Sequence, residues 1–358
     1  MNYSSAQQSL LRDYAEKHAI HLAFAGCNIR VASNDATLIG ELSNYFARYV
    51  ATDEHPVIEL VLNETEVIPP PVPLTEWPRP EGKRGKEAYA DLLDARLIEK
   101  RRTGLLFLQG VDKGVVAGPL RRNINQVVNF INNQTISHWK RDGWEICHAA
   151  ALAGPGGLVA FGGLSGGGKS TLMLHLMNAG PYSFISNDRL LIRRINGEVL
   201  ARGVAKMPRV NPGTLLNNPA LTQVLPEDRR NALNGLSNDE LWTLEEKYDA
   251  PMAEIFGEHR IAEEGPLKAL VILTWERESR GAPELHPCSL ERADRALQAI
   301  MKGPGPFHAD SMGHFVGAEA VVPAAPYLQT LGDLPAFQLR GGVDFGSAVR
   351  LCQPLLDL

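Results

Sequence analysis

A short glycine-rich segment, GGLSGGGKST at residues 162–171, constrains this chain more than any other feature. It follows the apolar run Leu158 to Phe161, which has the character of a buried strand. It precedes TLMLHLMNAG, an apolar stretch of helical character that closes at Gly180. Gly163 to Ser170 satisfies the pattern G-x-x-x-x-G-K-[ST]. Strand, glycine loop and helix in this order predict an α/β fold with a phosphate-binding loop.

Each position of the loop has a chemical reason. Glycines let the backbone wrap with its N–H groups turned inward, where side chains would collide with phosphate oxygens. Lys169 would place a positive charge against the β and γ phosphates, and the Ser170 hydroxyl would be a Mg²⁺ ligand beside a helix N-terminus. We therefore predict ATP and Mg²⁺ as cofactors, the alternative being a glycine-rich turn that binds nothing. The predicted nucleotide-binding residues are Gly163, Ser165, Gly166, Gly167, Gly168, Lys169, Ser170 and Thr171.

A carboxylate that could share the metal follows soon after the loop. Asp188 lies nineteen positions after Lys169, at the end of the apolar segment YSFISN. Phosphate-binding loops of this kind use an acid at the end of a nearby strand as a second Mg²⁺ ligand. The sequence therefore predicts Ser170 and Asp188 as the metal ligands, and an ordinary surface acid is the other interpretation of Asp188.

The segment after Asp188 predicts a β-hairpin. LLIRRI and EVLARG are joined by Asn196-Gly197, the dipeptide that favours a two-residue hairpin turn. A hairpin here indicates a mixed sheet and not an all-parallel one.

The first 140 residues predict a smaller N-terminal α/β domain. Residues 19–31 and 56–67 have strand character, and Ser33-Asn34-Asp35 are polar residues suited to capping a helix between them. A proline-rich linker occupies about 69–86. Two further strands, 96–102 and 103–110, and a helix from Ile124 to about Trp139 complete this domain. Residues 141–358 form the second predicted domain, in which EICHAAALAG at 145–154 is expected to be one strand.

Composition excludes several classes of protein. The formal net charge of −5 gives no whole-protein signature of nucleic-acid binding. The four cysteines form no C-x-x-C motif, which fits a reducing compartment. The first twenty residues contain no apolar signal core, and the longest uncharged segment is broken by glycine and proline. We expect a cytoplasmic protein that uses neither a membrane nor a nucleic acid.

Several motifs together resemble a known family. GLSGGGKS, FISND and the upstream His148 resemble the P-loop domain of HPr kinase/phosphorylase, which is related in fold to PEP carboxykinases. SNDRLLI, KMPRVNPGTLL, LWTLEEKYD and MKGPGPF resemble the subfamily called HprK-related kinase B. The resemblance to HPr kinase covers about residues 145–205, and that to the subfamily covers most of the C-terminal two-thirds.

This resemblance implies a P-loop, HPr kinase/PEP carboxykinase-like mixed sheet with helices, and ATP-dependent phosphoryl transfer to a hydroxyl. It implies that Lys169 holds the phosphates and that His148 lies near the metal and the γ-phosphate. The chain departs from the family at two positions. Asn187 replaces the first of two paired acids, and Leu200 replaces the glutamate of a Glu-x-Arg-Gly element. Neither reverse phosphorolysis nor HPr as the acceptor is therefore expected.

Cations for the transition state are predicted in KMPRVNPGT. Lys206 and Arg209 are the candidates, because a loop bracketed by proline and glycine could fold over the γ-phosphate, and a charged surface turn is the alternative. Arg209 joins Lys169, Asp188 and His148 as a predicted catalytic residue, while Lys302 and Arg340 are secondary candidates.

The predicted function is an ATP- and Mg²⁺-dependent kinase, with a protein or peptide serine or a small molecule as acceptor. A nucleotide-binding regulatory module without phosphotransfer and a simple ATPase are the alternatives. The sequence leaves open the acceptor, the choice between ATP and GTP, and whether the chain forms a homo-oligomer.

Overall fold

A computed structural model describes residues 1–52, 55–78, 85–164, 166–237, 240–241, 244, 246–291 and 294–357. The described chain divides into two compact units, one comprising Met1–Gly143 with Gly303–Val321 and the other Trp144–Lys302 with Val322–Leu358. The domain limits of 1–140 and 141–358 remain a prediction, and no sequence pattern indicated that Gly303–Val321 packs with the first unit. No helix among the described residues is long and apolar enough to cross a membrane.

The second unit is built on a mixed sheet with the strand order β10-β14-β15-β18-β12-β11-β13, which β20 and β19 extend beside β18. Its strands are β10 (Glu145–Cys147), β11 (Ala149–Gly154), β12 (Gly157–Gly163), β13 (Ser183–Ser186), β14 (Leu190–Ile195), β15 (Glu198–Gly203), β18 (Glu264–Leu273), β19 (Glu284–Cys288) and β20 (Ala336–Arg340), with a separate ribbon of β16 (Arg209–Val210) and β17 (Tyr248–Asp249). Its helices are α4 (Lys169–Ala179), α5 (Pro212–Leu216), α6 (Glu227–Leu233), α8 (Met252–Phe256), α9 (Asp294–Ile300), α10 (Ala325–Leu331) and α11 (Phe345–Asp357).

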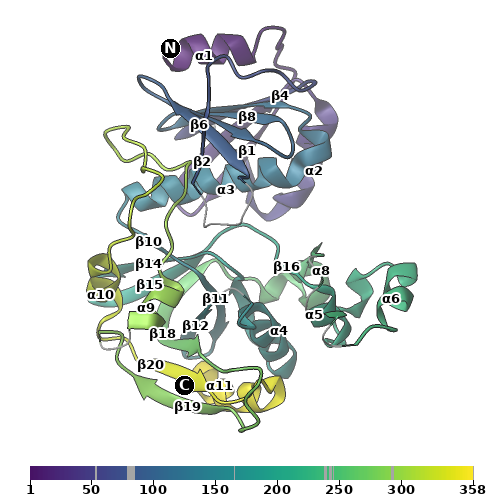
Figure 1. Ribbon diagram of the computed structural model, residues 1–358, viewed down its shortest axis with the longest axis vertical. Helices are drawn as coiled ribbons and strands as arrows, with labels where there is room; N and C mark the ends of the chain where they lie inside the picture. The colour runs from purple at the N-terminus through teal and green to yellow at the C-terminus, as the bar shows by residue number, and fades with distance from the viewer. Residues whose placement is uncertain are drawn as a thin grey trace. The chain divides into compact units, whose positions relative to one another are not determined.

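Helices cover both faces of this sheet (Figure 1). Successive side chains of a strand point to opposite faces, so Val159 and Phe161 of β12 pack with α4 and α11, whereas Leu158 and Ala160 pack with α9 and α10. All four side chains are buried. An uninterrupted apolar strand is therefore required ahead of the glycine loop, which is the pattern in the sequence.

The pairing of β11 decides where the site forms. β11 is antiparallel to both β12 and β13, so the carboxyl ends of β12 and β13 lie at the same sheet edge as the start of β11. The glycine loop follows β12, Asp188 follows β13, and His148 precedes β11. Three segments separated in sequence therefore meet at one edge.

The prediction of one strand across 145–154 is wrong. The chain breaks at His148, because β10 pairs with β14 whereas β11 pairs with β12 and β13. The backbone N–H of His148 donates to the carbonyl of Ile300 at 2.7 Å and not to a neighbouring strand. The break is what places an imidazole at the sheet edge.

The predicted Asn-Gly hairpin is confirmed. β14 and β15 are antiparallel with Ile195 opposite Glu198, and Asn196 and Gly197 have φ values of 51° and 85°. Two left-handed residues in a row match the twist of the flanking strands. The mixed character of the sheet is confirmed as well.

The first unit also contains a mixed sheet, in the order β3-β1-β2-β4-β9-β8-β7-β6-β5. Leu106 and Leu108 of β8 pack against α1, whereas Phe107 contacts Phe130 of α3 with ring centroids 5.1 Å apart. The strands are β1 (His18–Phe24), β2 (Cys27–Ser33), β3 (Val50–Ala51), β4 (Ile58–Glu64), β5 (Thr75–Glu76), β6 (Glu87–Asp91), β7 (Arg96–Lys100), β8 (Leu105–Gln109) and β9 (Lys113–Gly118), and the helices are α1 (Tyr3–Leu10), α2 (Ala36–Tyr45) and α3 (Ile124–Arg141).

Two details of this unit bear on the sequence expectations. Residues 19–31, expected as one strand, form the β1–β2 hairpin, which turns at Gly26 with φ of 78°. The predicted capping segment Ser33-Asn34-Asp35 is confirmed, and Asp35 is the residue that caps α2, because its carboxylate accepts a hydrogen bond from the backbone N–H of Leu38 at 2.7 Å. The turn at Gly26 and the cap at Asp35 each depend on residues only a few positions apart in the chain.

Arg96 explains why Gly303–Val321 belongs to the first unit. Its side chain is only 1% exposed, pairs with Asp91 at 2.6 Å and donates to the carbonyls of Pro306 and Val316. Its guanidinium also lies 4.8 Å from the ring centroid of Phe315. A buried guanidinium needs such a full set of partners, and here half of them come from a segment two hundred residues away.

We predict that Gly203→Ala destabilises the second unit. A Cβ at Gly203 would lie 1.9 Å from the carbonyl oxygen of Ile185, so β15 would have to move away from the strand that positions Asp188. The cost should be about 2–3 kcal/mol, which lowers the thermal midpoint by about 5–10 °C. Gly213→Ala is the control, because its Cβ would make an ordinary 3.5 Å contact. Equal midpoints for the two variants in thermal unfolding would show that the close approach is not required.

Candidate active site

The glycine loop has the backbone of a phosphate cradle. Gly163, Gly166 and Gly168 have φ values of 152°, 80° and 85°, which side chains rarely tolerate. Helix α4 starts directly after Gly168 with no side-chain hydrogen bond capping its first turn. Its first N–H groups are therefore available to an anion, and the helix dipole favours one there. Ser165 of the predicted set lies outside the described residues.

Lys169 is held at the base of this loop. Its ammonium group donates to the carbonyls of Gly163 at 2.8 Å and Leu164 at 3.1 Å, and the residue is 7% exposed. Burial lowers the pKa of Lys169 to about 8, although Asp188 favours the charged form. An ammonium group has three donors and two are used, so an anion at the loop would satisfy the third and restore the pKa.

Aromatic side chains support the loop from behind. The Trp275 indole N–H donates to the carbonyl of Gly167 at 2.9 Å, and the Trp275 and Phe345 rings meet edge to face with centroids 5.1 Å apart. A Cβ on Gly168 would lie 3.1 Å from Phe345 and 3.2 Å from Trp275. The position therefore requires glycine both for its φ and for space. His175 stacks on Phe345 and burial lowers its pKa, so it is neutral near pH 7.

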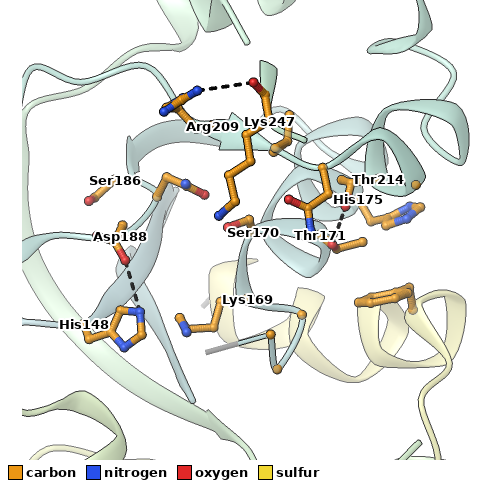
Figure 2. A pocket seen from close by; sticks show the side chains of 18 of the residues that line it. His148, Lys169, Ser170, Thr171, His175, Ser186, Asp188, Arg209, Thr214 and Lys247 are labelled. Carbon is orange, nitrogen blue, oxygen red and sulfur yellow. Dashed lines mark hydrogen bonds and ion pairs between the residues drawn. The ribbon is translucent and has the colours of Figure 1, made fainter. Parts of the chain in front are cut away.

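Asp188 receives two cationic or polar donors, one on each oxygen. His148 Nε2 lies 3.0 Å from Oδ1 (Figure 2). Lys302 Nζ donates to Oδ2 at 3.1 Å. Burial by itself would raise the pKa of Asp188, but the hydrogen bond from His148 and the charge of Lys302 outweigh it and hold the pKa well below its usual range. The Ser186 hydroxyl donates to the Arg189 carbonyl at 2.6 Å, which fixes the turn that carries this carboxylate.

The oxygen donors at this edge fit Mg²⁺. Asp188 is ionised at all physiological pH values and Ser170 lies in the first turn of α4, so both are hard oxygen ligands of the kind that Mg²⁺ takes. The Asn187 side-chain oxygen is buried and has no partner among the described atoms, which leaves another acceptor beside them. The described residues contain no cluster of three or more His, Cys, Asp or Glu suited to a metal. Mg²⁺ sites completed by substrate phosphates need no such cage.

One cavity of about 900 Å³ connects these groups with a second, cationic wall. The wall is formed by Lys206, Arg209 and Lys247, which reach the cavity from β16, β17 and the residues before them. Arg209 donates to the Lys247 carbonyl at 3.3 Å (Figure 2) and pairs with Asp249 at 3.2 Å. Across the cavity, the Thr171 and Thr214 hydroxyls are 2.9 Å apart and join α4 to α5.

The structure brings most of the predicted residues together. His148, Lys169, Ser170, Asp188 and Arg209 line the same cavity. The roles assigned to them remain predictions. Of the secondary candidates, Lys302 contacts Asp188, whereas Arg340 bonds to the Gln338 side chain at 2.8 Å and is not among the residues that line the cavity.

Sequence reasoning missed Lys247, Thr214 and the two aromatic residues behind the loop. Trp275 and Phe345 were not predicted as site residues, because sequence periodicity shows which side chains are buried but not which backbone carbonyl an indole N–H contacts. Lys247 reaches the cavity because Arg209 pairs with Asp249, forty residues further along the chain. Neither of these short strands has a sequence pattern that predicts the pairing. The motif LWTLEEKYD was the only hint that this segment has a role.

No protein-family model matches this chain, and no curated protein matches it. Among solved structures it is similar to the Hpr(Ser) kinase/phosphatase from Coxiella burnetii, with 9% sequence identity and a TM-score of 0.31. The match covers 59% of this chain and 90% of that chain. Similarity this low carries no argument about function, so the proposals below rest on the site.

We predict that affinity for Mg²⁺-bound ATP falls as pH rises through about 8. Lys169 loses its proton there in the free protein, and a bound polyanion favours the protonated form, so binding above that pH must take up a proton. The dissociation constant should rise by up to about tenfold per pH unit between pH 8 and 9.5 and be nearly constant from 7 to 7.5. Isothermal titration calorimetry measures both the affinity and the proton uptake.

Lys169→Arg is the control for this pH dependence, because a guanidinium stays charged throughout the range. Its profile should be flat. A flat profile for the unmodified protein would contradict the assignment of Lys169 to the phosphates.

We predict that Trp275→Phe weakens nucleotide binding by about five- to tenfold. The change keeps an aromatic ring behind the loop but leaves the Gly167 carbonyl without its donor, at a cost of about 1 kcal/mol. Trp77→Phe in the first unit makes the same chemical change at a residue that does not line the cavity and should leave binding unaltered. If both variants bind ATP like the unmodified protein, the indole does not hold the loop.

Proposed function

We propose that this chain is an ATP- and Mg²⁺-dependent kinase that transfers the γ-phosphoryl group to a hydroxyl of a protein or peptide serine or of a small molecule. One observation carries the proposal. The glycine loop with Lys169, and the pair His148–Asp188, lie at one sheet edge and line one cavity. Phosphoryl transfer depends mainly on positioning and charge neutralisation, and this edge supplies groups for both.

Each group has a role that its surroundings support. The loop N–H groups and Lys169 would hold the β and γ phosphates, because Lys169 has a donor in excess of its two carbonyl partners. Ser170 and Asp188 would hold Mg²⁺, which neutralises phosphate charge when it is bound. His148 and Lys302 bind one oxygen each of Asp188, so they fix the orientation of the carboxylate at the edge of the cavity.

The site needs no strong general base to remove the proton of the acceptor hydroxyl. Asp188 is a weak base because its pKa is held low, and Asn187 is an amide that accepts no proton. In a loose transition state the acceptor hydroxyl keeps most of its proton until transfer is nearly complete. The proton then passes to solvent water. Transfer from ATP to a hydroxyl therefore needs no strong general base at this site.

A regulatory module that binds ATP without transferring phosphate is the second candidate. Two features favour it. Asn187 is neutral, and the oxygens of the neighbouring Asp188 carboxylate already contact His148 and Lys302. The two functions differ in one measurable property, because only the kinase turns ATP over when an acceptor is present.

We predict that Lys169→Met and Asp188→Asn each lower phosphoryl transfer at least about a hundredfold. The assay follows label from γ-labelled ATP to acceptors in a lysate that contains both protein and small molecules. Lys268→Met is the matched control, because Lys268 is 48% exposed, pairs with Glu198 and does not line the cavity. Unaltered transfer in either site variant would refute the site, whereas tight ATP binding with no transfer by the unmodified protein would establish the regulatory module.

A further inference from the structure

The cavity carries more positive charge than a nucleotide needs. Among the described residues that line it are six lysines and arginines, namely Lys169, Arg189, Lys206, Arg209, Lys247 and Arg277, and a single carboxylate, Asp188. Arg209 pairs with Asp249 and Arg189 with Asp188, so these two arginines need no charge from a ligand, whereas Lys169, Lys206 and Lys247 do. Its volume of about 900 Å³ lies near the upper limit for small-molecule pockets, so a second ligand fits beside the first.

The cations form two groups on either side of Asp188. Lys169 acts on this carboxylate from the base of the glycine loop, and Lys302 donates to its Oδ2 at 3.1 Å. Lys206 and Arg209 line the cavity on the β16 side. There the charges of Arg189 and Arg209 lower the pKa of Lys206, and the charge of Asp188 raises it. The first group belongs with the phosphates of the nucleotide. The second lies on the opposite wall, where a phosphoryl acceptor would have to be.

Lys247 lines the same wall of the cavity as Lys206 and Arg209. Lys206 and Lys247 are the two cations of this wall that form no ion pair with a described carboxylate. Within the described chain no carboxylate lies within ion-pair distance of either ammonium group, whereas Arg209 is neutralised by Asp249 at 3.2 Å. Burial and the neighbouring Arg189 charge lower the pKa of Lys206 to about 8, a cost that an external anion would remove. Figure 2 shows the Lys247 side chain extending into the cavity towards Ser170.

The position of Lys247 is fixed and not incidental. Its carbonyl accepts a hydrogen bond from Arg209 at 3.3 Å, and the next residue, Tyr248, pairs with Val210 in the β16–β17 ribbon. Val210 is 2% exposed and belongs to the core beneath the site. The ribbon therefore holds the two lysines at one wall of a cavity whose opposite wall is the glycine loop.

We propose that the acceptor is a small hydroxyl compound that carries a phosphate group of its own, and that Lys206 and Lys247 bind this phosphate. The proposal rests on the kinase function above and narrows its acceptor. The acceptor oxygen forms a bond to the γ-phosphorus, the bond from that phosphorus to the bridging oxygen breaks, ADP leaves with the bridging oxygen, and the hydroxyl proton passes to water. The two lysines bind without reacting.

The test is binding of inorganic phosphate to the full chain already saturated with Mg²⁺ and a non-hydrolysable ATP analogue, followed by isothermal titration calorimetry. We expect one phosphate per chain with a dissociation constant of about 1 mM. The double variant Lys206→Met with Lys247→Met should lose at least tenfold in phosphate affinity and keep the analogue affinity within about twofold. Lys268→Met should retain both affinities.

Every other result decides against the proposal. If the saturated protein binds no phosphate, or the double variant binds it equally well, the second anion site does not exist. If the double variant loses analogue affinity as strongly as phosphate affinity, the lysines serve the nucleotide. Lys247→Met alone repeats the test with a more conservative change should the double variant fold poorly. If the unmodified protein does not bind the analogue, the kinase function fails and this inference fails with it.

Discussion

The site depends on one constraint of sheet pairing, which is that β11 runs antiparallel between β12 and β13. Because of it, the end of β12, the end of β13 and the start of β11 lie at the same edge. A glycine loop alone can hold phosphate through backbone N–H groups, but it cannot supply a carboxylate. The pairing brings Asp188 and His148 to the loop, although forty residues separate them.

Charge balance around Asp188 is the second element of the account. The carboxylate is the only one among the described residues that line the cavity, and it lies between cations on both sides. The carboxylate lowers the free-energy cost of burying the cations, and the cations lower the cost of burying the carboxylate. Removal of Asp188 would therefore leave several cations facing one another. The same balance makes Asp188 a poor base and a permanently charged ligand, which suits a site that neutralises phosphate more than one that abstracts protons.

The parts that the sequence predicted are those that local chemistry determines. The glycine loop with its following helix, the Asn196-Gly197 hairpin and the Asp35 cap each depend on residues within a few positions of one another. The parts it missed depend on long-range pairing. The break at His148 arises because adjacent strands have different partners, and Gly303–Val321 joins the first unit because Arg96 needs its carbonyls. Residues such as Lys247 enter the site through a two-residue ribbon that no periodicity reveals.

The central claim is that the glycine loop and Asp188 act together on one metal–nucleotide complex. A crystal structure with Mg²⁺ and a non-hydrolysable ATP analogue tests it most directly. The account predicts the β and γ phosphates within the loop, Lys169 in contact with them, and a Mg²⁺ ion about 2.1 Å from Ser170 Oγ that Asp188 binds directly or through a water molecule. Phosphates bound elsewhere, or a metal ion that Asp188 does not contact, would contradict it.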